Sequence, residues 1–142
     1  AFPAVGAYFF KYFGVLFKEE ERWKVTGATY MLISTVGAFF FLEKPVAVLA
    51  LLFLSIGDPA AALVGSRYGR IRLFRKSLEG SLAFFAMSVV LGWAFFLTGQ
   101  VSSFLPAVAG AATAAIVELL PLPLDDNLLV PMFAGVALAA LL

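Results

Sequence analysis

The sequence predicts an all-α integral membrane protein, a polytopic bundle of about five to six transmembrane helices, one of them broken. Of its 142 residues 63% are hydrophobic and 13% are charged, and the mean hydropathy is +1.00. These values lie far from those of soluble domains. Apolar runs of about 17 to 20 residues recur, each long enough to cross a hydrocarbon layer of about 30 Å. We therefore expect a single transmembrane domain over residues 1–142, embedded in a lipid bilayer.

The first apolar segment, residues 2–17, carries Lys11 at its centre. A mid-bilayer lysine is costly unless it reaches the interface or faces the bundle interior. We expect a helix here that spans the membrane or lies at its surface. The charged run at residues 18–24 follows, with Trp23 as an interfacial anchor. Residues 26–42 then form the first clear span.

The second span is expected to contain a break. A short turn at residues 43–45 leads into an apolar run from residue 46, which Gly57, Asp58 and Pro59 interrupt. Asp58 suits an N-cap and Pro59 the first position of a new helical piece. A helix N-terminus at membrane depth presents free N–H groups, so the pattern predicts a phosphate-binding site there.

A basic loop is expected at residues 65–76, where Gly65 and Gly69 permit tight turns near a ligand. Ser77 can cap the next span, residues 78–97, and Glu79 falls in its first turn.

A short polar link at residues 98–103 precedes a span over residues 104–120, which is rich in glycine and alanine and carries Glu118 near its end. Small residues let helices approach closely, which suits a homodimer. The last segment, residues 128–142, is preceded by three capping residues, Asp125, Asp126 and Asn127.

Alternating these spans across a bilayer places nearly every charge on one side. The run at 18–24, the loop at 65–76 and the acidic junction after Pro123 all fall on that side. The positive-inside rule makes it cytoplasmic. We therefore expect one polar site that faces the cytoplasm.

The chemistry of that site must depend on carboxylates, because the chain has no cysteine and no histidine. A net charge of +1 gives no argument for nucleic-acid binding. Acids near arginines and lysine suit a divalent cation and a phosphorylated ligand, with Arg67, Arg70 and Lys76 on the phosphates. The plainer interpretation is also open: the basic loop as an orientation signal, and Asp58, Ser77 and the acidic junction as helix caps. Glu118, inside an apolar span, is a functional candidate by default.

Three ordered motifs resemble a known family, the CTP-dependent lipid kinases that include dolichol, phytol and farnesol kinases and the fungal CTP-dependent diacylglycerol kinase. The motifs read GDPAAALVGSRYGR at residues 57–70, KSLEGSLAF at 76–84 and VELLPLPLDDNLLVP at 117–131, and ERWKVTGATY at 21–30 resembles the segment that precedes them. Members usually carry further membrane segments before this region. The resemblance therefore implies either a truncated or minimal version of the family's chain or an N-terminal motif that is dispensable.

The resemblance implies Mg²⁺-dependent transfer of the γ-phosphate of CTP to the hydroxyl of a membrane lipid alcohol, which could be a polyprenol, a phytol-type isoprenoid or diacylglycerol. It places the catalytic residues at Asp58, Lys76, Glu79 and Glu118. Nucleotide binding falls to Gly57, Gly65, Arg67, Gly69, Arg70, Lys76, Ser77 and Asn127. The metal ligands it implies are Asp58, Glu79, Asp125 and Asp126.

Two other functions remain open from the sequence. A phosphatidate cytidylyltransferase would use the same donor and metal but release pyrophosphate and form a CDP-lipid. An ion-coupled transporter also uses broken helices and intramembrane acids such as Asp58 and Glu118.

Overall fold

The computed structural model describes residues 27–142, which form five helices and one small hairpin. The segments predicted at residues 2–17 and 18–24 lie outside this part of the chain. The elements are α2 (Gly27–Phe41), α3 (Lys44–Tyr68), β1 (Arg72–Leu73), β2 (Lys76–Ser77), α4 (Leu78–Leu97), α5 (Phe104–Leu119) and α6 (Asp126–Ala139).

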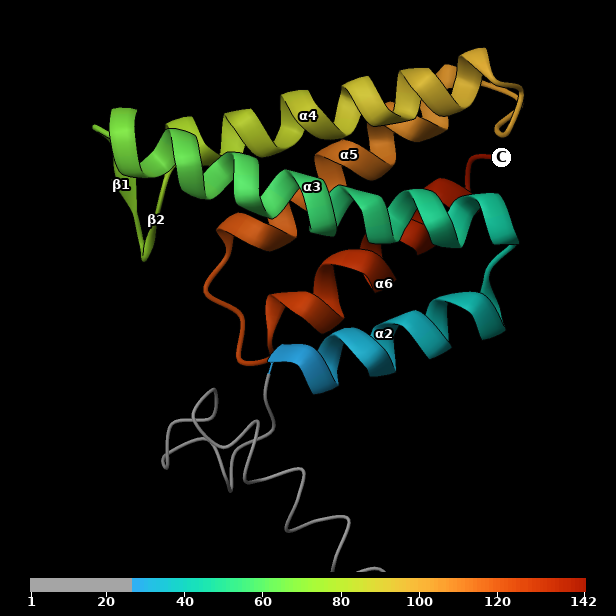
Figure 1. The fold of residues 1–142 in the computed structure, drawn as a ribbon, viewed down its shortest axis with the longest axis horizontal. Helices are drawn as coiled ribbons and strands as arrows, with labels where there is room; N and C mark the ends of the chain where they lie inside the picture. Colours follow the sequence, from blue (N-terminus) through green and yellow to red (C-terminus); the bar gives the residue numbers. More distant parts are fainter. Residues whose placement is uncertain (1–26) are drawn as a thin grey trace, which may run out of the picture.

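The helices run up and down between two ends of the bundle (Figure 1). Helices α3 and α4 lie side by side, α5 packs on α4, and α6 contacts α2, α3 and α5. The β1–β2 hairpin lies at the same end as the α5–α6 connection and the start of α2, whereas the α2–α3 and α4–α5 connections lie at the other end. The basic hairpin and the acidic α5–α6 connection, which are predicted to share one side of a membrane, thus lie at one end of the bundle.

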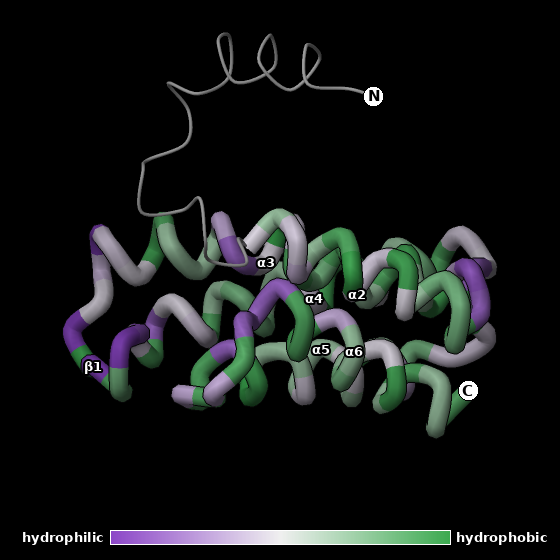
Figure 2. Tube along the Cα trace, turned by 90° about the horizontal axis from the view of Figure 1, so that it is seen from below, coloured by the Kyte–Doolittle hydropathy of each residue, from purple (hydrophilic) through white to green (hydrophobic). Residues whose placement is uncertain are grey.

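The all-α prediction is confirmed for the described residues. By length and composition α3 and α4 could cross a membrane, whereas α2, α5 and α6 are apolar but shorter. Hydrophilic residues gather around β1 at one end of the bundle, with a smaller group at the opposite end (Figure 2). Large apolar side chains such as Phe40, Val90 and Leu105 are exposed on the outer faces, which suits contact with lipid.

The predicted break in the second span is wrong, because α3 continues through Gly57 and Asp58 with Pro59 inside it. Asp58 is therefore no N-cap, and no helix N-terminus forms there. A proline removes one backbone hydrogen bond and costs about 3 kcal/mol in a helix. A full break would leave several backbone groups unpaired in an apolar environment, at several kcal/mol each. The continuous helix is the less costly solution.

The predicted basic loop is also partly wrong. Helix α3 extends to Tyr68, so Gly65 lies in its last turns, and the remaining residues form the antiparallel hairpin with Leu73 opposite Lys76. Gly69 caps α3 at a φ of −65°, which any residue can adopt. Its role and that of Gly65 is spatial, because a Cβ on Gly65 or Gly69 would lie 2.8 or 2.9 Å from Ser77. These glycines let the end of α3 approach the start of α4.

The boundaries after the hairpin agree closely with the prediction. Ser77 is the N-cap of α4, and its hydroxyl accepts a hydrogen bond from the Gly80 amide at 3.1 Å. Asp125 caps α6 by accepting from the Asn127 amide at 2.9 Å, so that helix begins two residues before the predicted start at residue 128. The packed core between the helices includes Phe53 and Phe84, both fully buried.

Candidate active site

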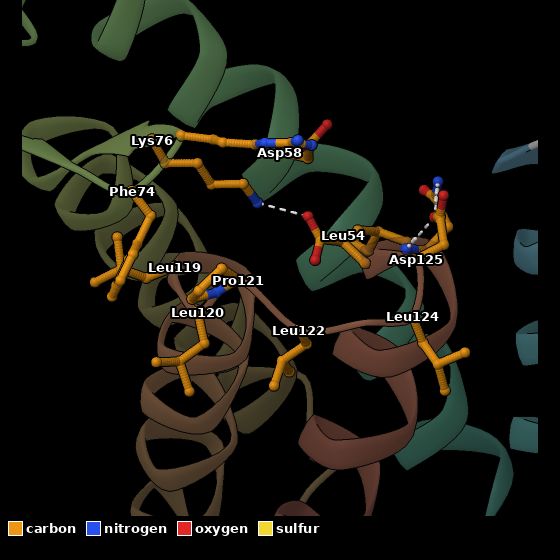
Figure 3. A pocket seen from close by; sticks show the side chains of 13 residues that line it. Leu54, Asp58, Phe74, Lys76, Leu119, Leu120, Pro121, Leu122, Leu124 and Asp125 are labelled. Atoms are coloured by element: carbon orange, nitrogen blue, oxygen red, sulfur yellow. Dashed lines mark hydrogen bonds and ion pairs between the residues drawn. The ribbon is translucent and has the colours of Figure 1, made fainter.

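Lys76 is the centre of the polar end of the bundle. From strand β2 its Nζ lies 2.8 Å from Glu118 Oε1 at the end of α5 and 2.6 Å from Asp126 Oδ2 at the start of α6. Figure 3 shows the Lys76 side chain extended toward its carboxylate partner. One ammonium group therefore joins β2 to the end of α5 and the start of α6, and its contact with Asp126 spans 50 positions of the sequence.

Glu118 is the most deeply buried charge of this cluster, with 4% of its side chain exposed, against 29% for Lys76 and 35% for Asp126. Its second oxygen, Oε2, accepts a hydrogen bond from the Ser81 hydroxyl at 3.1 Å. A buried carboxylate is tolerated when a charge and a hydrogen bond compensate for lost water. Lys76 and Ser81 provide both.

The ionisation of Lys76 follows from the same contacts. Partial burial lowers the pKa of the ammonium group, but the hydrogen bonds and charges of Asp126 and Glu118 outweigh burial, so the pKa lies above its usual value. Lys76 is therefore a fixed positive charge at neutral pH.

Two cavities lie on either side of this lysine. The first, about 550 Å³, is lined by apolar residues such as Leu54 and Phe74 and by the acids Asp125 and Asp126. In Figure 3 Phe74 lies on the side of Lys76, and Leu54 lies beside Asp125. The second, about 300 Å³, is walled by α3, the hairpin and α4. Pockets of about 300–1,000 Å³ are typical for small ligands. Three residues line both cavities: Asp58, Arg75 and Lys76.

Among the predicted site residues, Asp58 has a carboxylate that is free to bind a ligand. Its side chain is exposed on α3 and lines both cavities. Within residues 27–142 it makes no side-chain hydrogen bond or ion pair. An unpaired carboxylate beside Arg75 and Lys76 is well placed for a cation or a phosphate-bound metal.

Glu79 has a different environment. Its carboxylate accepts hydrogen bonds from the backbone amides of Arg70, at 3.1 Å, and Ile71, at 3.2 Å, and so ties the start of the hairpin to α4. It lines neither cavity. In this arrangement Glu79 positions the basic hairpin.

The predicted nucleotide-binding residues are divided by the fold. Gly65 and Ser77 line the second cavity and Asn127 lines the first, where its amide donates to Asp125 Oδ1 at 2.7 Å. The other predicted residues line neither cavity: Gly57, Arg67, Gly69 and Arg70. Gly57 instead packs against α4, where a Cβ would lie 2.9 Å from the Phe84 ring.

Sequence reasoning missed three residues that line the second cavity, Arg72, Arg75 and Ser81. The arginines were visible only as part of a basic run, and the hairpin decides which of them face the cavity. A signal for Ser81 existed: it follows Ser77 by four residues, which puts both hydroxyls on one face of α4.

The acids of the first cavity, Asp58, Asp125 and Asp126, are oxygen ligands of the kind that Mg²⁺ prefers. Within the described residues no group of three or more acidic side chains forms a ready metal cage. Mg²⁺ usually takes one or two carboxylates together with phosphate oxygens and water. The donor set therefore fits a metal that arrives with a phosphorylated ligand.

Comparison with curated proteins found relatives named as lipid kinases. CTP-dependent diacylglycerol kinase 1 of Saccharomyces cerevisiae is 34% identical over 86 residues, 58% of this chain and 30% of that protein. Probable phytol kinase 1, chloroplastic, of Glycine max is 34% identical over 118 residues, 72% of this chain and 39% of that protein. Dolichol kinase of Saccharomyces cerevisiae is 37% identical over 67 residues, 43% of this chain and 13% of that protein.

The resemblance seen in the motifs is thus confirmed: homologues of this chain are lipid kinases, and the yeast diacylglycerol kinase is CTP-dependent by name. The chain spans less than two fifths of the length of each of these relatives. No family model and no solved structure matches the chain.

Proposed function

We propose that this chain carries the catalytic centre of a CTP-dependent kinase that phosphorylates the hydroxyl of a membrane lipid alcohol. The observation that carries the proposal is the Lys76 cluster, where a protonated lysine, a buried Glu118 and Asp126 meet between two cavities. The names of the homologues supply the donor and the acceptor class.

The second cavity is the proposed phosphate site. Arg72, Arg75 and Lys76 bring three positive charges to it, and Ser77 adds a hydroxyl. Arginine binds phosphate through paired N–H donors, and lysine acts as a point charge. Roles for Gly57, Arg67, Gly69, Arg70 and Asn127 stay predictions from the motifs.

Asp58 is the proposed metal ligand on α3, with Asp125 or Asp126 on the facing side of the first cavity. When bound, Mg²⁺ would neutralise phosphate charge, which is its usual part in phosphoryl transfer. Glu79 is a weaker candidate ligand, because its carboxylate already accepts from the amides of Arg70 and Ile71.

In the proposed reaction the lipid hydroxyl oxygen forms a bond to the γ-phosphorus of CTP while the bond from that phosphorus to the β–γ bridging oxygen breaks. CDP leaves and the hydroxyl proton passes to a protein carboxylate. This reaction needs positioning and charge neutralisation above all. The absence of histidine from the chain is therefore no obstacle.

The alternatives are less well supported. A phosphatidate cytidylyltransferase would bond the phosphatidate oxygen to the α-phosphorus and release pyrophosphate, but the homologues are named as kinases. The transporter hypothesis rested on a broken helix and on intramembrane acids, and the first of these is missing because α3 is continuous. The basic residues at the hairpin end favour a cytoplasmic site by the positive-inside rule, and a homodimer stays a prediction.

The test is incubation of the purified protein with Mg²⁺, a lipid mixture and CTP labelled at the α- or the γ-phosphate, followed by lipid extraction. The mixture contains dolichol, phytol, diacylglycerol and phosphatidate. We expect lipid labelled from γ-labelled CTP only. Label from α-labelled CTP would establish the cytidylyltransferase instead, and a protein that labels no lipid would overturn both.

The matched variants are Asp58→Asn and Glu43→Gln. Each removes one exposed carboxylate, but Asp58 lies inside α3, whereas Glu43 precedes its first residue, makes no side-chain cap and lines neither cavity. We expect Asp58→Asn to lower the rate by about 100-fold or more, the usual scale for removing one electrostatic contact to the transition state. Glu43→Gln should leave it unchanged.

A further inference from the structure

A third cavity opens on the outer surface between α4 and α5. It is a shallow groove of about 220 Å³, and its accessible lining is wholly apolar. Leu82 and Phe85 of α4 and Ala112, Ala115 and Ile116 of α5 form its walls. Both helices are expected to face lipid here, since Leu82 and Ile116 are 57% and 58% exposed.

This groove adjoins the polar site through one shared residue. Ser81, the one polar residue among those that line the groove, also lines the second cavity, where the proposed phosphate site lies. Its hydroxyl donates to Glu118 Oε2 at 3.1 Å. Ser81 therefore separates the apolar groove from the second cavity, which Glu118, the two arginines and Lys76 also line.

We infer that the α4–α5 groove binds the hydrocarbon chain of the lipid alcohol and delivers its hydroxyl to Ser81 and Glu118. The inference rests on the proposed function. The chain would pack against apolar side chains by van der Waals contact, and the hydroxyl would meet groups that can form hydrogen bonds with it. A substrate dissolved in the bilayer could then enter from the side without crossing the aqueous end of the bundle.

The same geometry assigns the proton acceptor. Glu118 touches Ser81 at the end of the groove, whereas Glu79 lines none of the three cavities and is held by the hairpin amides. Glu118 thus accepts the hydroxyl proton as the bond to phosphorus forms. Before that step, the ion pair with Lys76 stabilises the negative charge of Glu118. Glu79 acts as a positioning residue for the hairpin.

The experiment narrows the groove with Ala112→Phe and adds the same bulk outside it with Ala86→Phe, an exposed position on α4 that does not line the groove. We expect kcat/KM for a long-chain alcohol to fall at least about tenfold in Ala112→Phe, because the added ring overfills the groove that the chain would occupy. KM for CTP should not change, and Ala86→Phe should match the wild type. Equal values for the two variants would overturn the inference.

A binding readout separates the groove from the proposed reaction. A lipid alcohol with a photoreactive group on its chain should label α4 and α5 in the wild type, and unlabelled alcohol should compete for this labelling, whereas phosphatidylcholine should not. If labelling occurs without phosphoryl transfer from CTP, the groove assignment stands and the kinase proposal fails. Competition by phosphatidylcholine would mean that the groove binds bilayer lipid without preference for the alcohol. Crosslinks between two copies of the chain would mean that the groove is a dimer contact. Either result would overturn the inference.

If Ala112→Phe does not fold, as judged by CTP binding, Leu82→Ala provides the second variant, with Val90→Ala as its control on the exposed face of α4. Leu82→Ala should lower kcat/KM for the long-chain alcohol about threefold, because it removes part of the groove wall and the van der Waals contacts that this wall provides. No difference between Leu82→Ala and Val90→Ala would again contradict the groove.

Discussion

Replacing Lys76 by methionine removes a charge and keeps most of the side-chain volume. Glu118 then loses its charge partner while 4% of its side chain is exposed, and it keeps only the hydrogen bond from Ser81. Removing one partner of a buried ion pair costs about 3–5 kcal/mol. Because Lys76 itself is 29% exposed, water can reach the site, so we expect a loss near the lower limit, about 3 kcal/mol.

The double variant Lys76→Met, Glu118→Gln tests the cause of that loss. A glutamine at residue 118 has no charge to compensate and can still accept the hydrogen bond from Ser81. We expect the double variant to recover most of the stability and to lie within about 1 kcal/mol of the wild type, since neutral replacements of buried pairs are often tolerated. It should nonetheless be inactive as a kinase, because the proposed phosphate contact is lost.

The measurement is the free energy of unfolding in mixed detergent, by denaturant titration of the four members of the cycle: wild type, both single variants and the double variant. Asp126→Asn is the control, and because Asp126 is 35% exposed it should cost at most about 1 kcal/mol. Two results would refute the idea that Glu118 is a buried charge stabilised by Lys76. One is a Lys76→Met protein as stable as the wild type, and the other is a double variant no more stable than Lys76→Met.

Two further outcomes follow from the hairpin and from the contact between α3 and α4. Glu79→Gln removes the charged acceptor from the two backbone amides at the start of the hairpin, so the amides of Arg70 and Ile71 should exchange hydrogen faster while those of α4 stay protected. Gly80→Ala places a Cβ 2.8 Å from the Ala61 carbonyl oxygen and should destabilise the protein by about 1–3 kcal/mol. In Gly37→Ala the new Cβ meets only ordinary van der Waals contacts. This variant should stabilise the protein, because alanine favours a helix over glycine by up to about 1 kcal/mol. Thermal unfolding of both variants measures the difference in stability.

The sequence predicted best those features that depend on local rules. Ser77 before an apolar run, with Glu79 in the first turn, located the start of α4 to the residue. The alternation of apolar spans also predicted that the basic loop and the acidic junction would share one end, which the Lys76 contacts to α5 and α6 confirm. The charged run at residues 18–24, predicted at the same end, lies outside the described residues. Glu118 stood out because a carboxylate in an apolar helix needs a partner.

The features that the sequence could not predict depend on tertiary contacts. Pro59 is a helix-breaking signal in water, but an apolar environment raises the cost of leaving backbone groups unpaired, so α3 continues. Which arginines face the cavity depends on a hairpin whose strands have two residues each, too short for any alternation of side chains to be read. The pairing of Lys76 with Asp126 spans fifty residues of sequence.

Glu118 occupies a position that stability alone would not favour. It is the penultimate residue of α5, where the negative end of the helix dipole disfavours a carboxylate, and it is buried as well. Asp126, by contrast, lies in the first turn of α6, where the dipole favours it. We therefore expect Glu118→Gln, which leaves Lys76 paired with Asp126, to remain within about 1 kcal/mol of the wild type in stability while kcat for the lipid alcohol falls sharply. A Glu118→Gln protein that keeps full kcat would remove the carboxylate from the reaction and leave Ser81 and the groove to be explained by packing.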